Sequence, residues 1–287
     1  MNSKKVSVII PCYNQGHFLG EALASLERST EKDVEIIIVN DGSTDENTNK
    51  IINELDSARY IVLNQRNQGL AMARNNGIAM AKGKYILPLD ADNYIDPELI
   101  SKAVDELESN AEIDIVYTDC TVFGDLQEQK TVGAFNFIKL LNENYIDALT
   151  VYRKKVWEVN KGYDAKMPFM GWEDWDFWIN SHKNGFKFHY INQSLYYYRH
   201  LSTSMIHSAG LESKSKKVRL YISQKYAKYI AQEYPQQRGE LLLKDAIYKM
   251  ANGQKLGGVV DIFHSAFFPV FKMQVLFQRI KLGLSLL

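Results

Sequence analysis

The chain has 287 residues, of which 46% are hydrophobic and 24% charged, with 34 basic and 34 acidic side chains. This length allows one large or two modest domains, and the composition is that of a globular protein. A net charge of zero leaves no electrostatic footprint for nucleic acid. Cys12 and Cys120 are too few for a disulfide framework and too far apart for a zinc knuckle, so we expect reduced thiols in a cytosolic protein.

No segment has the pattern of a targeting or spanning sequence. The first apolar run breaks at Pro11, which is too early for the core of a signal peptide. No window approaches the roughly 20 apolar residues that a membrane span needs. We therefore expect a cytoplasmic protein.

The first half alternates short apolar runs with amphipathic stretches. We expect strands over 6–10, 34–40, 59–64, 84–90 and 113–119, and helices over 16–28, 45–55, 69–81 and from Pro97 onward. Such alternation predicts a mostly parallel sheet covered by helices on both faces. In sheets of this kind ligands bind at the carboxyl ends of the strands. The segments that follow the first four strands are "PCYN", "DGSTD", "NQRNQG" and "DAD", so we expect these polar turns to meet at one edge.

Two carboxylates, Asp90 and Asp92, end the fourth expected strand. On an extended backbone, side chains two residues apart point to the same side. Hard oxygen ligands suit Mg²⁺ or Mn²⁺, which commonly bind one or two carboxylates together with substrate phosphates. We therefore predict a divalent metal here. The alternative is that one aspartate caps the next helix, with Asp96 sharing that role.

The second half is less regular. "EDWDFWINSHKNG" predicts a helix that ends at Gly185, and "FKFHYI" alternates as a strand does. The chain turns helical and charged from about residue 208, so we expect domains at 1–207 and 208–287. Beyond Pro269 an apolar helical stripe carries a basic opposite face. It could pack on the first domain, form the seam of a homo-oligomer, or contact the inner face of a membrane peripherally.

Four segments together carry a family resemblance: "VSVIIPCYN", "EIIIVNDGSTD", "NQGLAMARNNGIAMAKGKYILPLDAD" and "FMGWEDWDFWI". In this order, over roughly residues 5–205, they resemble the family 2 glycosyltransferases of the GT-A fold. The resemblance implies an α/β, Rossmann-like fold with a mostly parallel mixed sheet. It also implies inverting transfer of a hexose from a nucleotide diphosphate sugar, expected to be a UDP-sugar, to an acceptor hydroxyl. The implied acceptor is a glycan or lipid-linked glycan of a bacterial surface polysaccharide.

The resemblance also implies site residues, position by position. Asp174, with Glu173 beside it, matches the catalytic base, and Asp92 and His200 match ligands of Mn²⁺ or Mg²⁺. The nucleotide sugar would contact Pro11, Tyr13, Asn14, Asp41, Asn67, Gly69, Arg74, Asp90, Ala91, Trp172 and Arg199.

Several of these residues have a plainer interpretation. Arg74 could form only a surface salt bridge, and His200 could be structural. Glu173 and Asp174 could simply favour a helix N-terminus through its dipole. The tryptophans at 172, 175 and 178 would raise a carboxylate pKa by excluding water, or would stack on sugar rings.

Two other functions fit parts of the pattern. A nucleotidyltransferase that makes activated sugars shares the layered sheet and the metal carboxylate. It usually carries a basic, glycine-rich N-terminal loop, and "IIPCYNQGHF" contains no lysine or arginine. A non-catalytic scaffold that binds nucleotide sugars need not keep Asp92 and Asp174. The sequence also lacks G-x-G-x-x-G and the P-loop lysine motif.

Overall fold

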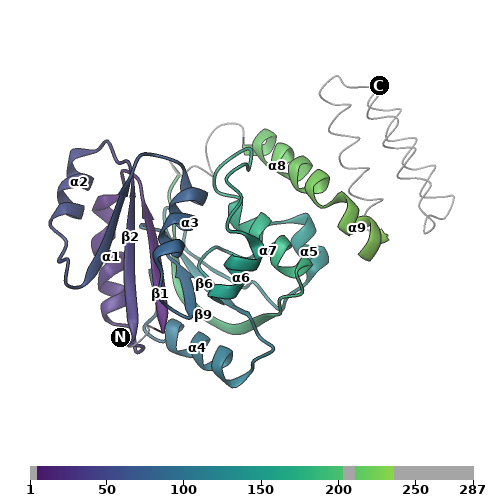
Figure 1. Ribbon diagram of the computed structural model, residues 1–287, viewed down its shortest axis with the longest axis horizontal. Helices are drawn as coiled ribbons and strands as arrows, with labels where there is room; N and C mark the ends of the chain where they lie inside the picture. The colour runs from purple at the N-terminus through teal and green to yellow at the C-terminus, as the bar shows by residue number, and fades with distance from the viewer. Residues whose placement is uncertain (1–4, 203–210, 236–287) are drawn as a thin grey trace. The chain divides into compact units, whose positions relative to one another are not determined.

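The computed structural model describes residues 5–202 and 211–235. By its internal contacts the chain divides into two compact units, Met1–Ala209 and Gly210–Leu287. In the described part, the first unit is built on one mixed sheet with strand order β3-β2-β1-β4-β8-β6-β9-β5, and β7 pairs with β6 (Figure 1).

The first four strands lie parallel, as the sequence predicts. They are β1 (Val6–Cys12), β2 (Val34–Asp41), β3 (Tyr60–Gln65) and β4 (Tyr85–Pro88). All of β1 is buried, because it lies between β2 and β4 with helices on both faces. β4 ends two residues before Asp90, so the expected extended backbone through Asp90 and Asp92 is wrong. Residues 91–92 instead form a turn.

Four helices cover this half of the sheet: α1 (Gly16–Glu27), α2 (Glu46–Asn53), α3 (Leu70–Met80) and α4 (Leu99–Ser109). One hydrophobic cluster joins α1, α2 and α4 to alternate residues of β1, including Val8 and Ile10. α3 packs on the other face, where Gly77 lies against Ile9. Figure 1 shows α1 and α3 on opposite sides of β1 and β2.

The first residues of α2 and α4 differ slightly from the expected helix starts. Asp45 caps α2, because its Oδ2 accepts a hydrogen bond from the Thr48 amide at 2.8 Å. The helix expected from Pro97 instead begins at Leu99. Pro97 lies in the turn before it, where its carbonyl accepts hydrogen bonds from the Thr30 amide and hydroxyl.

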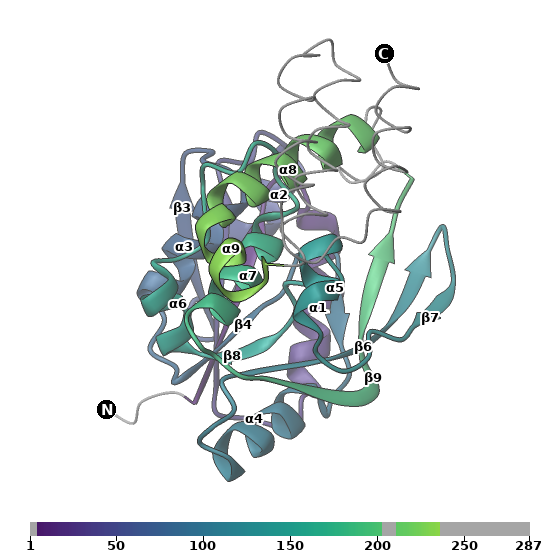
Figure 2. The ribbon, with the colours of Figure 1, turned by 90° about the vertical axis from the view of Figure 1, so that its right-hand side faces the viewer.

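The second half of the sheet contains β5 (Tyr94–Ile95), β6 (Ile115–Gly124), β7 (Glu128–Lys130), β8 (Val151–Arg153) and β9 (Phe188–His200). β9 runs parallel to β6, and the register shifts twice between Thr118 and Cys120. β9 is much longer than the strand predicted from "FKFHYI" and extends to His200, as Figure 2 shows beside β6 and β7.

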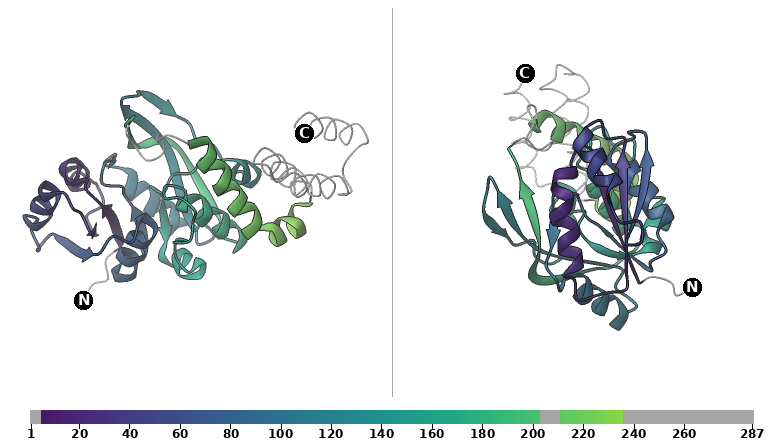
Figure 3. Two further views of the ribbon diagram at one scale, coloured as in Figure 1. Left: turned by 90° about the horizontal axis from the view of Figure 1, so that it is seen from above. Right: turned by 90° about the vertical axis from the view of Figure 1, so that its left-hand side faces the viewer.

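Three further helices follow this half: α5 (Phe137–Asn142), α6 (Lys154–Asn160) and α7 (Glu173–Lys183). They contact one another through α7, which packs on both α5 and α6. α7 closes as predicted, because Gly185 takes a positive φ of 85° and its amide donates to the His182 carbonyl. Figure 3 gives the sheet and these helices from two further directions.

The second unit begins with α8 (Leu211–Lys225) and α9 (Ala227–Glu233). Val218, Ile222, Tyr226 and Ile230 recur every four residues and are buried, as in an amphipathic pair of helices. The apolar stripe predicted beyond Pro269 lies outside the described residues. Across 5–202 and 211–235, no helix combines the length and hydropathy that crossing a membrane requires.

Candidate active site

The four polar turns after β1, β2, β3 and β4 meet at one edge of the sheet, as the sequence predicts. Asn14 links the first two turns, because its Oδ1 accepts hydrogen bonds from the amides of Thr44 at 2.8 Å and Asp45 at 3.0 Å. Gln15 links the first turn to the fourth through a 3.3 Å hydrogen bond from its Nε2 to Asp92 Oδ2.

Asp41 joins the second turn to the third. Its two oxygens accept hydrogen bonds from the amides of Gln68 at 2.8 Å and Gly69 at 2.9 Å, and from the Gln65 side chain at 2.8 Å. Gly69 has a φ of 85°, which a residue with a side chain rarely adopts. Asp41 therefore holds the loop that carries Asn67 and Gly69. Its predicted contact with a nucleotide base stays a prediction.

A pocket of about 680 Å³ opens at this edge. Nine of the residues predicted from the sequence line it: Pro11, Arg74, Asp90, Asp92, Trp172, Glu173, Asp174, Arg199 and His200. They come from separate parts of the chain, namely the ends of β1, β4 and β9, helix α3 and the start of α7. The fold thus gathers them into one cavity.

The other predicted residues lie elsewhere. Tyr13 is exposed, and Asn14, Asp41, Asn67 and Gly69 belong to the linked turns beside the pocket. Ala91 has no exposed surface, and its methyl group belongs to the hydrophobic cluster under α1. The structure therefore does not support a side-chain contact between Ala91 and a ligand.

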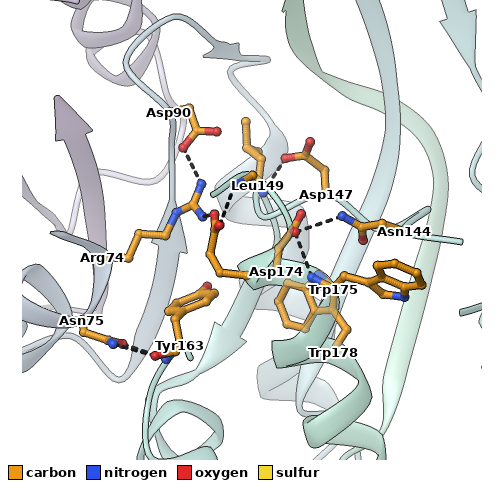
Figure 4. A network of polar contacts seen from close by, with 12 residues as sticks. Arg74, Asn75, Asp90, Asn144, Asp147, Leu149, Tyr163, Asp174, Trp175 and Trp178 are labelled. Atoms are coloured by element: carbon orange, nitrogen blue, oxygen red, sulfur yellow. Dashed lines mark hydrogen bonds and ion pairs between the residues drawn. The ribbon is translucent and has the colours of Figure 1, made fainter. Parts of the chain in front are cut away.

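Arg74 is the buried cation of the pocket wall. Only 1% of its side chain is exposed, and its guanidinium forms ion pairs with Asp90, at 2.6 Å, and with Glu173 (Figure 4). These carboxylates come from the loop after β4 and from the first turn of α7. The plainer interpretation of Arg74 as a surface salt bridge is therefore wrong: it ties together the two segments that carry the predicted metal ligand and the predicted base.

Among the described residues Asp92 has no ion pair of this kind. Its backbone carbonyl accepts a hydrogen bond from Arg199 Nε at 3.0 Å, and its carboxylate accepts a long contact of 3.3 Å from Gln15 Nε2. Burial, followed by repulsion from Asp90, raises the pKa of Asp92 to about 7. Among the described residues the charge of Arg199 opposes this rise only in part.

The Asp92 carboxylate is compatible with a divalent ion that also binds substrate phosphates. Among the residues that the structure describes, no three His, Cys, Asp or Glu side chains are arranged to hold a metal by themselves. Mg²⁺ or Mn²⁺ needs only one or two carboxylates when a diphosphate supplies the other oxygens. Asp92 fits this role, because it is a buried carboxylate that Asp90 repels and that a cation would stabilise.

The Arg199 side chain lies between α1 and β6. Its guanidinium stacks on Phe18 and Phe123, with ring-centroid distances of 4.7 and 4.3 Å, and it also pairs with Glu21. The Arg199 amide donates to the Asn93 side chain at 2.8 Å. Arg199 therefore holds the Asp92 loop against the end of β9, next to His200.

Asp174 lies in the first turn of α7 and is 8% exposed. Its Oδ1 accepts hydrogen bonds from the Asn144 side chain at 2.9 Å and from the Trp175 amide at 2.8 Å. Burial, followed by the carboxylates of Glu173 and Asp147, raises the pKa of Asp174 well above its ordinary value, and Arg74 opposes this rise. A raised pKa makes the ionised carboxylate a stronger base than that of an exposed aspartate.

The neighbours of Asp174 are held by specific contacts. Glu173 is occupied by Arg74 and by the Gly171 amide, which donates to its Oε2 at 2.8 Å. Trp175 and Trp178 are core residues whose indole N–H groups donate to the carbonyls of Leu140 and Ile146. Of the three tryptophans, only Trp172 lines the pocket.

Among the lining residues that sequence reasoning missed are Gln15, Asn144, Asp147 and Tyr198. Gln15 and Tyr198 adjoin recognised motifs, so their neighbours were a usable signal. Asn144 and Asp147 lie in "NENYIDALT", where no local pattern distinguishes them from ordinary loop residues. Only the packing of this loop against α7 brings them to the pocket.

This sheet order, with a ligand pocket at the carboxyl ends of parallel strands, is the GT-A architecture, which solved structures also show. TarS of S. aureus in complex with UDP-GlcNAc matches with a TM-score of 0.60, covering 86% of this chain and 83% of that one at 17% identity. TarS in complex with UDP matches with a TM-score of 0.57. At these identities the likeness establishes the fold.

The sequence comparison establishes the family. The model of Glycosyl transferase family 2 matches residues 7–157, more than half of the chain. The chain therefore belongs to glycosyl transferase family 2 and is a glycosyltransferase enzyme.

Relatives span several kinds of organism. An uncharacterized glycosyltransferase of Methanocaldococcus jannaschii is 29% identical over 211 residues, 69% of this chain and 72% of the relative. The hyaluronan synthase of Pasteurella multocida is 28% identical over 221 residues. This match covers 73% of our chain but only 22% of the synthase, so it concerns one part of a larger protein.

Proposed function

We propose that this glycosyltransferase is an inverting enzyme that transfers a hexose from a UDP-sugar to an acceptor hydroxyl. The observation that carries the proposal is Asp174, a buried carboxylate of raised pKa that lines the pocket at the start of α7. The UDP-sugar donor is supported by TarS, whose structures contain UDP or UDP-GlcNAc.

The reaction proceeds by single displacement. The acceptor oxygen attacks the anomeric carbon on the face opposite the diphosphate, and the bond from that carbon to the diphosphate oxygen breaks as the new C–O bond forms. Asp174 takes the hydroxyl proton, and UDP leaves with the electron pair. Because attack and departure occur on opposite faces, the configuration at the carbon inverts.

Asp174 rather than Glu173 acts as the base. Both oxygens of Glu173 are engaged, one by Arg74 and one by the Gly171 amide. Glu173 therefore positions α7, while Asp174 keeps an oxygen for the acceptor. Asn144 orients Asp174 through its hydrogen bond to Oδ1.

Asp92 and His200 would hold Mn²⁺ or Mg²⁺, which, when bound, would neutralise charge on the departing diphosphate. Gln15 and Arg199 position the Asp92 loop for this role. Pro11, Tyr13, Asn14, Asp41, Asn67, Gly69, Arg74, Asp90, Trp172 and Arg199 lie in or beside the pocket and would form the donor site.

We also propose the wider context. Residues 1–207 form the catalytic domain and 208–287 a helical region. The name of the Pasteurella synthase supports a polysaccharide product, with a glycan or lipid-linked glycan as acceptor. Cys12 and Cys120 are both free and buried, which supports a cytoplasmic location.

The test is the variant Asp174→Asn. We expect UDP affinity, measured by calorimetry with Mn²⁺, to stay near that of the wild type, while UDP release from UDP-GlcNAc falls by about 10²- to 10⁴-fold. The exposed Asp105→Asn on α4 is the control. Loss of UDP affinity parallel to the loss of turnover would place the base elsewhere.

The same assay separates the other candidate functions. A transferase releases UDP slowly by hydrolysis, a nucleotidyltransferase releases diphosphate, and a binding scaffold releases neither.

A further inference from the structure

Asp147 lines the pocket but has no part in the reaction just described. It lies in the loop between α5 and β8, and its Oδ1 accepts a hydrogen bond from the Leu149 amide at 2.8 Å. That contact makes a local turn around the aspartate. The turn needs only one of the two oxygens. Asp147 Oδ2 has no hydrogen-bond partner among the residues that the structure describes.

Titratable side chains from several elements surround Asp147. They comprise Arg74 of α3, Asp90 and Asp92 after β4, Cys120 of β6, Lys130 of β7, Asp174 of α7, and Tyr196 and Tyr198 of β9. Burial, followed by the charge of Asp90, raises the pKa of Asp147, and Lys130 and Arg74 oppose that rise. This carboxylate therefore gains from a ligand that donates a hydrogen bond.

Tyr198 supplies a second polar group. It belongs to β9 and lines the same pocket as Asp147 and Asp174. The neutral phenol can donate one hydrogen bond and accept another. Among the described residues no hydrogen bond to this hydroxyl is present. Two polar groups of the pocket wall are thus available to a ligand.

We propose that Asp147 and Tyr198 form a subsite for the acceptor sugar and bind a hydroxyl next to the one that attacks. This inference rests on the proposed function. The ligand class is a sugar ring with two free neighbouring hydroxyls, one for Asp174 and one for the subsite. A site that pairs its polar groups with a substrate hydroxyl rejects analogues that lack it, because the protein groups are then left unpaired.

The placement of Asp147 favours the acceptor over the donor. Asn144, three residues before Asp147 on the same loop, donates to Asp174, so this loop flanks the proposed base. Asp90, which follows the donor-side strand β4, pairs with Arg74 instead. Figure 4 shows Asp147 on the Asn144 side of Asp174 and Asp90 on the Arg74 side.

The test uses methyl β-D-glucoside, methyl β-D-galactoside and methyl β-D-N-acetylglucosaminide as probes, titrated by ligand-observed NMR with and without UDP. The variants are Asp147→Asn, which keeps an oxygen for the Leu149 amide, and Tyr198→Phe, which removes only the hydroxyl. Asp56→Asn is the matched control, because Asp56 makes the same kind of turn with Ala58 outside the pocket.

We expect at least one glycoside to bind the wild type, and each pocket variant to weaken its Kd by at least 10-fold while the Kd for UDP changes less than twofold. A deoxy analogue that lacks the recognised hydroxyl should lose affinity for the wild type but not for Asp147→Asn. The control should bind as the wild type does.

Three results would overturn the subsite. They are failure of every glycoside to bind the wild type, unchanged glycoside affinity in Asp147→Asn, and an equal loss of UDP-sugar affinity, which would make Asp147 a donor contact. Failure of the proposed function is seen separately, as absence of UDP binding and of UDP release by the wild type, because glycoside binding is measured without turnover.

Discussion

Arg74 shows how one residue joins two parts of the site. Its guanidinium reaches Asp90, 16 positions later, and Glu173, 99 positions later. A buried arginine between two carboxylates satisfies charges that would otherwise be costly to bury. The ion pairs therefore position the DAD turn and the first turn of α7 relative to one another.

Replacing Arg74 tests this role. Arg74→Met should lower the free energy of unfolding by about 3–5 kcal/mol, because it leaves the buried Glu173 carboxylate without the cation that neutralises it. The measurement is urea denaturation. The control is Arg59→Met, whose ion pair with Glu27 is exposed and whose loss should change stability little. The double variant Arg74→Met, Glu173→Gln should recover part of the loss. If Arg74→Met unfolds at the same urea concentration as Arg59→Met, the buried pairs are not structural.

The raised pKa of Asp174 predicts how the stability of the folded protein changes with pH. Because its pKa is raised in the folded state, the folded protein binds this proton more tightly than the unfolded chain does. The contribution is present below the ordinary carboxyl pKa of about 4 and is lost as the pH rises through the raised value. Asp174→Asn should therefore have a higher Tm than the wild type at pH 8, and the difference should shrink towards pH 4.

Asp45 provides the opposite case. Hydrogen bonds from Thr48 lower the pKa of Asp45, so its ionised form stabilises the folded state. Asp45→Asn should then have a lower Tm than the wild type at pH 8, and this difference should shrink towards pH 4. Equal pH dependence in the two variants would contradict the assigned pKa directions.

At the scale of elements, α3 is pressed close to the sheet. A Cβ atom added at Gly77 would lie 2.5 Å from Ile9 Cγ2 and 2.9 Å from Val39 Cγ2, both on buried strands. This close contact places Arg74, one turn earlier on α3, beneath the pocket. The helix is therefore positioned by a small residue rather than by its own weak amphipathic pattern.

A pair of glycine substitutions tests that close approach. Gly77→Ala should destabilise the protein by about 1–3 kcal/mol through overpacking. Gly20→Ala in α1, where an added Cβ meets nothing within 4 Å, should stabilise it by about 0.5–1 kcal/mol, because alanine favours a helix more than glycine does. Thermal unfolding of both variants is the measurement. Stabilisation by both would show that α3 has room to move away from β1.

At the scale of the molecule, every described residue that lines the pocket lies before residue 202, inside the first unit. The second unit contributes none of the described lining residues. Donor binding should therefore not require it.

The fragment 1–209 should accordingly unfold cooperatively and bind UDP with a Kd within about threefold of the full chain, a difference of under 1 kcal/mol. Calorimetry on both proteins provides the comparison. A fragment that is folded but does not bind UDP would show that the second unit completes the donor site, and an unfolded fragment would contradict the division into units.

The sequence alone determined the parallel half of the fold and the edge where the site forms. Buried runs such as 6–10 and 34–40 and the turns after them are local patterns, and local patterns report strand periodicity and turn chemistry directly. The position of Asp174 at a helix start is equally local.

Only the tertiary structure decided which of these groups neutralise one another. The pairing of Arg74 with Asp90 and Glu173, the length of β9, and the arrival of Asp147 in the pocket all depend on contacts between residues far apart in the chain. Burial and charge pairing depend on what surrounds a side chain in space, and a carboxylate has the same letter in the sequence whether it faces a cation, a proton or a sugar hydroxyl.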